Sequence, residues 1–216
     1  MLSSFWKKKE NYFKNLNSFE DIVKFLNLKN REIRIDTLTP ATADNIDTLI
    51  RFWNIEDEEL NRAFAEREPI KLYINSLGGS IDAAMSIVDS ISMSRTPIYT
   101  FNIGTVQKES FLIYIAGHKR LAYVNSTFMY SDSMLSKFNE NEEINESSFY
   151  SKDNAWVGIA KNIKLLFLDK VNITEAQYDK HNKKEWWFTA DDALKLHICN
   201  EISRKHFHYV KSKELV

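Results

Sequence analysis

Cysteine is almost missing from this sequence, which contains only Cys199. A single cysteine cannot close a disulfide within the chain and gives no zinc-ligand spacing, so this composition is typical of a reducing compartment. Near the C-terminus, His206 and His208 would share one face of a strand and could bind a metal ion, but no third ligand is evident. We therefore expect neither a metal centre nor a cofactor.

Long apolar runs and an excess of one charge are missing as well. No stretch of about 18 consecutive apolar residues is present, which excludes a membrane-spanning helix. The lysine run at 7–9 is followed by Glu10 and Asn11, where a signal peptide would have its apolar segment, so we expect a cytoplasmic protein. The 29 Lys and Arg against 30 Asp and Glu leave a formal net charge of −1, which argues against a nucleic-acid binder.

The chain has enough apolar residues for one ordinary folded domain. Of its 216 residues, 44% are hydrophobic and 13% aromatic, so it can bury a substantial core. No repeat or linker divides it. We expect an N-terminal helical extension over 1–31, one domain over 32–203 that contains an acidic, solvated insertion at 55–68, and a C-terminal tail over 204–216.

Glycine is scarce, and two of the five glycines stand together after a predicted strand. The strand covers residues 70–75 and runs into Ser76-Leu77-Gly78-Gly79. Ser80 then caps a helix whose apolar residues recur at helical spacing. A diglycine in this place lets backbone N–H groups face a cleft, where they can hold a developing oxyanion or an extended peptide. The same dipeptide also serves any tight strand-to-helix turn.

A second strand-turn-helix unit follows directly. The pattern predicts a strand at 97–103, a turn at Gly104 and an almost wholly apolar helix at 109–116, which is typical of a buried helix. Two short strands at 121–124 and 127–130 come next. The alternation of strands and helices predicts an α/β fold built of stacked ββα units.

Helical patterns flank this middle part of the chain. A short helix is predicted after Ser18, another at 41–54, and a long one at 151–171 that is too apolar to stand alone and should pack against a partner. Capping boxes that begin at Thr174 and Thr189 predict two further short helices.

Several short motifs are spread through the predicted domain. They are Tyr73-Ile74-Asn75-Ser76-Leu77-Gly78-Gly79-Ser80, Gly104, Ala116-Gly117, Asn125-Ser126 and Thr189-Ala190-Asp191-Asp192-Ala193. Together they resemble the proteolytic subunit of the Clp protease over about residues 32–203, with Leu77 where that family usually has proline. The resemblance implies the fold shared with crotonases, in which stacked ββα units carry a protruding handle helix, here within 132–173. It also implies a homo- or hetero-oligomeric ring of Clp-type subunits and an AAA+ unfoldase as partner.

The family is an ATP-dependent serine endopeptidase, but its catalytic residues do not carry over to this chain. The resemblance places the nucleophile position at Lys108, the base at Ser131 and the residue that orients the base at His181. A serine hydroxyl becomes a nucleophile only when a neighbouring base takes its proton, and that base needs an acceptor of its own, so the three roles work as a set. The three replacements predict a subunit without peptidase activity that has a structural or regulatory role in the ring.

A second interpretation keeps the chain as a working serine-type peptidase. In one form, Ser131 is the nucleophile and Lys108 is its base, because desolvation in a cleft can lower a lysine pKa. In the other form, a shift of the helix by two residues brings Ser110 to the nucleophile position.

A third interpretation retains binding alone. The backbone donors of Gly78, Gly79 and Glu109 would then form an oxyanion-type cleft that binds a peptide or acyl group. The charge of Lys108 near a helix N-terminus is disfavoured by the helix dipole, and we expect the adjacent Glu109 to offset it.

Overall fold

The structure, a computed structural model, describes residues 18–131, 152–181 and 184–203. The expected tail over 204–216, with His206 and His208, and the first part of the expected handle region lie outside the described residues. The described elements, in chain order, are α2 (Phe19–Lys29), β1 (Glu32–Ile35), α3 (Pro40–Glu59), the 3₁₀ helix η3 (Phe64–Glu66), β2 (Ile70–Ser76), α4 (Ile81–Ser92), β3 (Ile98–Gln107), α5 (Glu109–Ala116), β4 (Lys119–Tyr123), β5 (Thr127–Tyr130), α6 (Lys152–Lys170), α7 (Glu175–His181), β6 (Trp186–Thr189), α8 (Ala190–Lys195) and β7 (Glu201–Ser203).

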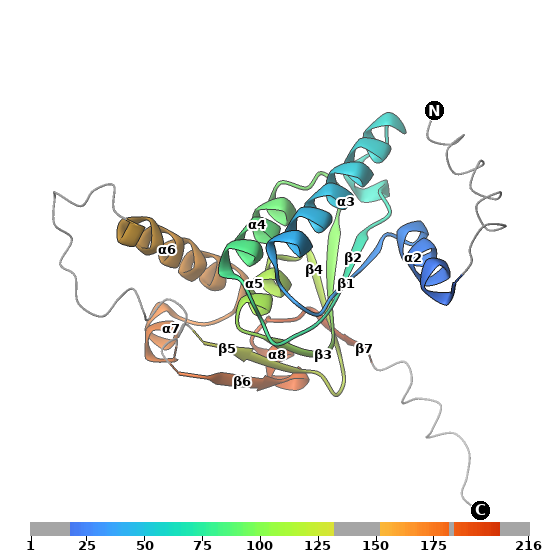
Figure 1. Ribbon diagram of the computed structural model, residues 1–216. Coiled ribbons are helices and arrows are strands. Elements are labelled where there is room, and N and C mark those ends of the chain that lie inside the picture. The colour runs from blue at the N-terminus through green and yellow to red at the C-terminus, as the bar shows by residue number, and fades with distance from the viewer. Residues whose placement is uncertain (1–17, 132–151, 182–183, 204–216) are drawn as a thin grey trace, which may run out of the picture.

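A mostly parallel sheet forms the centre of the molecule (Figure 1). Its main path runs β1-β2-β3-β4-β7, and all neighbours on this path are parallel. The long strand β3 changes partners along its length. Its first half pairs with β4, and Thr105–Gln107 pair with β5, which in turn pairs with β6 in antiparallel register. The predicted α/β fold is confirmed by this alternation of parallel strands and helices.

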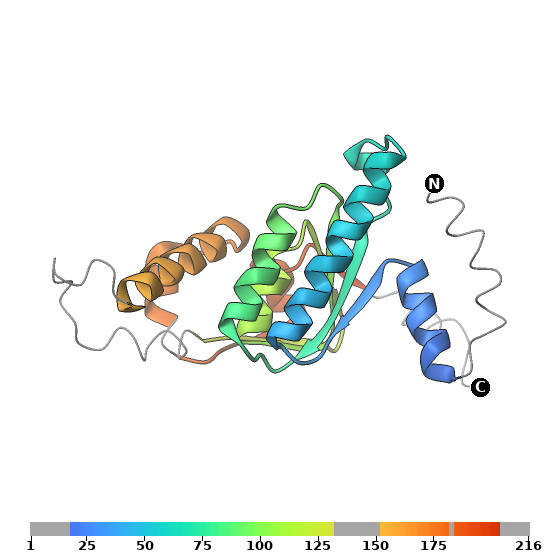
Figure 2. The ribbon, with the colours of Figure 1, turned by 45° about the horizontal axis from the view of Figure 1, so that its top comes forward.

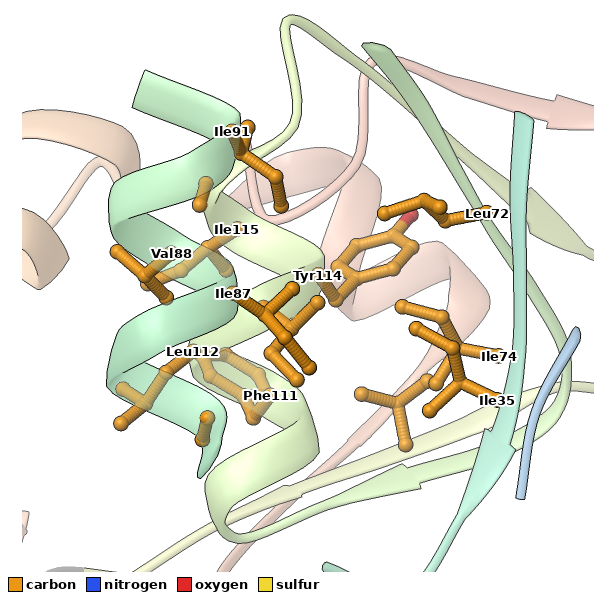
Figure 3. Packing of buried hydrophobic residues seen from close by; sticks show 14 of the residues in the cluster. Ile35, Leu72, Ile74, Ile87, Val88, Ile91, Phe111, Leu112, Tyr114 and Ile115 are labelled. Carbon is orange, nitrogen blue, oxygen red and sulfur yellow. The ribbon is translucent and has the colours of Figure 1, made fainter. Parts of the chain in front are cut away.

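Helices α3, α4 and α5 lie on one face of the sheet, and α5 packs between α4 and β3 (Figure 2). All eight residues of α5 are buried, as its apolar sequence predicts. Figure 3 shows Ile87 and Ile91 of α4 close to α5, and Tyr114 of α5 pointing toward Leu72 on β2. The Tyr114 hydroxyl donates to the Leu121 carbonyl (2.9 Å), so this buried ring leaves no polar atom unpaired.

An aromatic cluster attaches α6 to the rest of the fold. The Phe167 ring of α6 stacks on Phe111 of α5, with 5.5 Å between ring centroids, and lies 4.6 Å from Tyr130 and 5.2 Å from Tyr178. The hydroxyls of Tyr130 and Tyr178 share a hydrogen bond of 2.7 Å. The apolar excess of the predicted long helix is therefore explained in part within the chain, by packing on α5.

Arg31 forms buried ion pairs with two acidic residues near the end of α3. These acidic residues lie within 55–68, which we expected to be solvated. The guanidinium of Arg31 donates to both carboxylate oxygens of Asp57 (2.6 and 2.9 Å) and to Glu56 (2.8 Å), and the Thr96 hydroxyl donates to Asp57 (2.8 Å). Burial alone would raise the pKa of Asp57, but the hydrogen bonds from Arg31 and Thr96 outweigh it and hold that pKa below its ordinary value. We expected this stretch to be solvated, which is wrong for Glu56 and Asp57.

The predicted helix starts are confirmed by their caps. The hydroxyl of Ser18 accepts the Asp21 N–H (3.1 Å), and that of Ser80 accepts the Ala83 N–H (3.3 Å). The two capping boxes that begin at Thr174 and Thr189 are also formed. Among the described helices, none has the length and apolar character that crossing a membrane requires.

Candidate functional site

The turn from β3 into α5 has an unusual backbone at Lys108. This residue has φ 52° and ψ −121°, in a region that side-chain-bearing residues rarely adopt. Its N–H donates to the Met129 carbonyl (2.9 Å), and its own carbonyl accepts the Phe111 N–H (3.0 Å). A sharp strand-to-helix turn of this kind is how several hydrolase folds expose a nucleophile, so position 108 is an elbow that carries lysine.

The Lys108 ammonium has no ion-pair partner within the part of the chain that the structure describes. Our expectation that Glu109 offsets its charge is wrong as an ion pair. The Glu109 carboxylate instead accepts the Gly79 N–H (3.0 Å). It stands in the first turn of α5, where the helix dipole favours a negative charge.

The two glycines after β2 are required by close contacts. Gly78 has φ 108°, and a Cβ there would collide with the Glu109 carboxylate. Gly79 has φ 154°, and a Cβ there would lie 2.5 Å from the Leu38 carbonyl oxygen. Leu38 forms a parallel bridge with Gly79, and its carbonyl also accepts the Ser80 N–H (3.0 Å). The diglycine therefore holds three segments together at the end of β2.

Both N–H groups of the diglycine have acceptors within the chain. The Gly78 N–H donates to the Ser76 hydroxyl (3.3 Å), and the Gly79 N–H donates to Glu109. The sequence predicted a donor role for the Glu109 backbone N–H and an offset of the Lys108 charge, but not the contact of its carboxylate with Gly79. This acceptor role was missed because it depends on the contact with a glycine 30 residues earlier.

Ser110 lies inside the turn and faces the backbone. It is fully buried, and its hydroxyl accepts the Gln107 N–H (2.9 Å). The same hydroxyl lies 2.7 Å from the Gln107 carbonyl oxygen and 3.1 Å from that of Ser76, its available acceptors. The Ser110 hydroxyl therefore stabilises the backbone of the turn at Lys108.

Strand pairing brings Ser131 close to the elbow in the fold. Gln107 pairs with Met129, so Lys108 and the buried Ser131 come from the ends of neighbouring strands. The β5–β6 register ends with Tyr130 paired to Trp186, so Ser131 directly follows the last paired residue of β5 and Glu185 directly precedes the first of β6.

His181 ends α7, and its ring stacks with 4.6 Å between centroids on Trp186, the β6 residue that pairs with Tyr130 next to Ser131. Glu185 directly precedes β6 and was not predicted as a site residue from the sequence. Its Oε2 accepts the Trp187 indole N–H (3.0 Å).

Imidazole chemistry is not assembled in the described residues. Of the three histidines there, only His118 has a side-chain hydrogen bond, in which its Nδ1 accepts the Ile98 N–H (3.1 Å). The same residues hold no group of three potential metal ligands. A groove of about 920 Å³ between α3 and α4 lies apart from the elbow and the diglycine.

The comparison with known families decides the family to which this fold belongs. A profile described as Clp protease matches residues 58–206, which is more than half of the chain. The chain belongs to the Clp protease family. The family resemblance predicted from the sequence motifs is confirmed.

Individual Clp relatives are distant. An ATP-dependent Clp protease proteolytic subunit 2 from Treponema denticola is 23% identical over 147 residues, which cover 67% of this chain and 71% of the relative. A proteolytic subunit from Bdellovibrio bacteriovorus is 27% identical over 129 residues, or 58% of this chain and 57% of the relative.

A solved Clp structure shares the fold. A ClpP1 mutant from Listeria monocytogenes matches with a TM-score of 0.65 at 19% identity, and the match covers 85% of this chain and 98% of that one. The Clp-type fold predicted for this chain is confirmed by this likeness. The turn at position 108 therefore lies within a Clp-type fold, and its residue in this chain is lysine.

Proposed function

We propose that this Clp-family chain is a proteolytic-subunit homologue without peptidase activity, and that it is a structural or regulatory subunit of a cytoplasmic ring. The observation that carries the proposal is the elbow at Lys108. A lysine side chain has no hydroxyl or thiol with which to attack a carbonyl, so the turn presents no serine-type nucleophile at position 108.

The remaining serine near the elbow supports the same conclusion. The Ser110 hydroxyl is buried and bonded to the backbone groups that shape the turn. Its use as a nucleophile would require the elbow to open, since Ser110 would have to leave the Gln107 backbone. Catalysis depends on geometry before pKa, and this geometry is closed.

A Ser131–Lys108 dyad is the second candidate, and one observation favours it. Lys108 has no ion-pair partner among the described residues, and its strand end neighbours that of Ser131. Against it, the elbow presents position 108 toward the cleft, and Ser131 is buried on the neighbouring strand.

A fluorophosphonate probe separates these two candidates. We expect the purified full chain to show no labelling above that of heat-denatured protein, and no turnover of a fluorogenic oligopeptide, because it lacks an activated hydroxyl. Ser131→Ala and Ser110→Ala variants should give the same background. Labelling of the wild-type chain that disappears in either variant would establish a serine-type peptidase and overturn the proposal.

The ring assignment rests on family membership and on the exposed apolar residues of α6. Val157 and Leu165 of this helix are 41% and 56% exposed in the single chain. A homo- or hetero-oligomeric ring with Clp-type subunits would cover them, and an AAA+ unfoldase would be its partner. The mass of the purified chain, alone and after mixing with a catalytically active Clp subunit, tests this: a monomer under both conditions contradicts the ring.

A further inference from the structure

We propose that the Glu109 carboxylate permanently accepts the hydrogen bond of the Gly79 N–H, the donor that could otherwise bind an oxyanion or a peptide carbonyl. The diglycine cleft is then closed to peptide carbonyls. The inference deepens the proposed function and rests on it. It supplies a second reason, independent of Lys108, why the cleft does not process a peptide.

The contact is charged, short and sheltered. Glu109 Oε2 lies 3.0 Å from the Gly79 nitrogen, and the residue is only 5% exposed. A hydrogen bond from a backbone N–H to a carboxylate is roughly twice as strong as one to a neutral carbonyl. The carboxylate also lies in the first turn of α5, where the aligned peptide dipoles attract a negative charge.

The diglycine is shaped around this side chain. A Cβ on Gly78 would meet the Glu109 carboxylate before any other atom of the chain, and the next contact would be Lys108 Cβ at 3.1 Å. The space beside the diglycine is therefore filled by a side chain of the next strand-to-helix turn. An entering peptide would have to displace that side chain to reach the Gly79 N–H.

Displacement by a peptide carbonyl is unfavourable for a simple reason. The ligand offers a neutral acceptor in exchange for a charged one, and the released carboxylate loses its donor in a mostly buried place. Within the described residues, no lysine or arginine side chain forms an ion pair with Glu109 that could hold it in a second position. A small carboxylate, in contrast, has the charge and size that this position already accepts, and it should bind once Glu109 is removed.

The scarcity of glycine makes the contact directly measurable. The chain has five glycines, and Gly78-Gly79 is their only adjacent pair. Labelling with ¹³C,¹⁵N-glycine in the full chain therefore gives few amide signals. The Gly79 signal alone is split by a labelled preceding carbonyl, which assigns it without further variants.

We expect Glu109→Ala to move the Gly79 amide signal and to raise its hydrogen exchange rate by about tenfold or more, since a charge-assisted bond is lost. Glu109→Gln, which keeps the shape but not the charge, should have a smaller effect of the same sign. Added acetate should shift the Gly79 signal in Glu109→Ala and leave it unchanged in the wild-type chain. Asp82→Ala, which removes an exposed acid from the first turn of α4, is the matched control and should leave Gly79 unchanged.

The results separate this inference from the proposed function. The Gly104 and Gly117 signals report whether each variant is folded. Two outcomes would overturn the proposal that Glu109 occupies the Gly79 N–H: a Gly79 signal that stays unchanged in folded Glu109→Ala or Glu109→Gln, or a wild-type chain that responds to acetate as Glu109→Ala does. Neither outcome affects the fluorophosphonate result. Labelling of the wild-type chain by fluorophosphonate overturns the inactive subunit even if the Gly79 contact is found.

Discussion

Replacement of Arg31 by methionine should lower the free energy of unfolding by about 3 to 5 kcal/mol. The variant keeps most of the side-chain stem but removes the charge that neutralises Asp57 and Glu56. Asp57 is 0% exposed, so its carboxylate would be left in the interior with only Thr96 and the partly exposed Arg62 as donors. Urea denaturation followed by tryptophan fluorescence measures the change.

A matched control is the exposed ion pair between Arg95 and Glu58, an acidic residue of the same helix α3. Arg95 bonds to Glu58 at 2.6 Å, but the Arg95 side chain is 72% exposed, so Arg95→Met should cost less than about 1 kcal/mol. If the two variants unfold at the same urea concentration, the Arg31 cluster contributes no more than a surface ion pair, and our interpretation of it is wrong.

Phe167→Ala is expected to have an effect of similar size, again about 3 to 5 kcal/mol. The Phe167 ring is fully buried and contacts the rings of Phe111, Tyr130 and Tyr178. Its removal leaves a cavity between α6 and α5, because three aromatic neighbours cannot collapse into the space without moving their own backbones. Thermal or urea unfolding of the variant gives the measurement.

Phe19 provides the aromatic control for this experiment. It is 81% exposed, and Phe19→Ala should change the free energy of unfolding by no more than about 0.5 kcal/mol. A Phe167→Ala variant as stable as the wild-type chain would contradict the packing of α6 on α5.

The parts of the fold that were predictable are those controlled by neighbours in the sequence. The cap at Ser80 and the buried helix α5 follow from short patterns, and the structure confirms both. The end of α3 was not predictable in this way. Acidic residues usually indicate solvent, and the arginine that buries Asp57 stands 26 residues earlier, with no local pattern that links the two.

In the candidate site, too, features set by neighbouring residues could be predicted, and contacts between distant segments could not. The resemblance predicted the nucleophile position at 108 from its distance to the motifs on either side, and the backbone there has a positive φ. The role of the Glu109 side chain depends on how two separate segments meet. Its contact with Gly79, 30 residues earlier, leaves no spacing in the sequence that could be recognised in advance.

The division of β3 between two partners has a consequence for how this molecule transmits motion. The last residues of β3 are bonded to β5, and the Lys108 N–H is held by Met129 of β5 rather than by the main sheet. β5 pairs with β6, and Val106 at the end of β3 pairs both with Phe128 of β5 and with Ser76 of β2, so a shift of this two-stranded ribbon would act on the lysine turn and on the diglycine end of β2 together. The position of the Lys108 turn is therefore set jointly by the β5–β6 ribbon and by the end of β2.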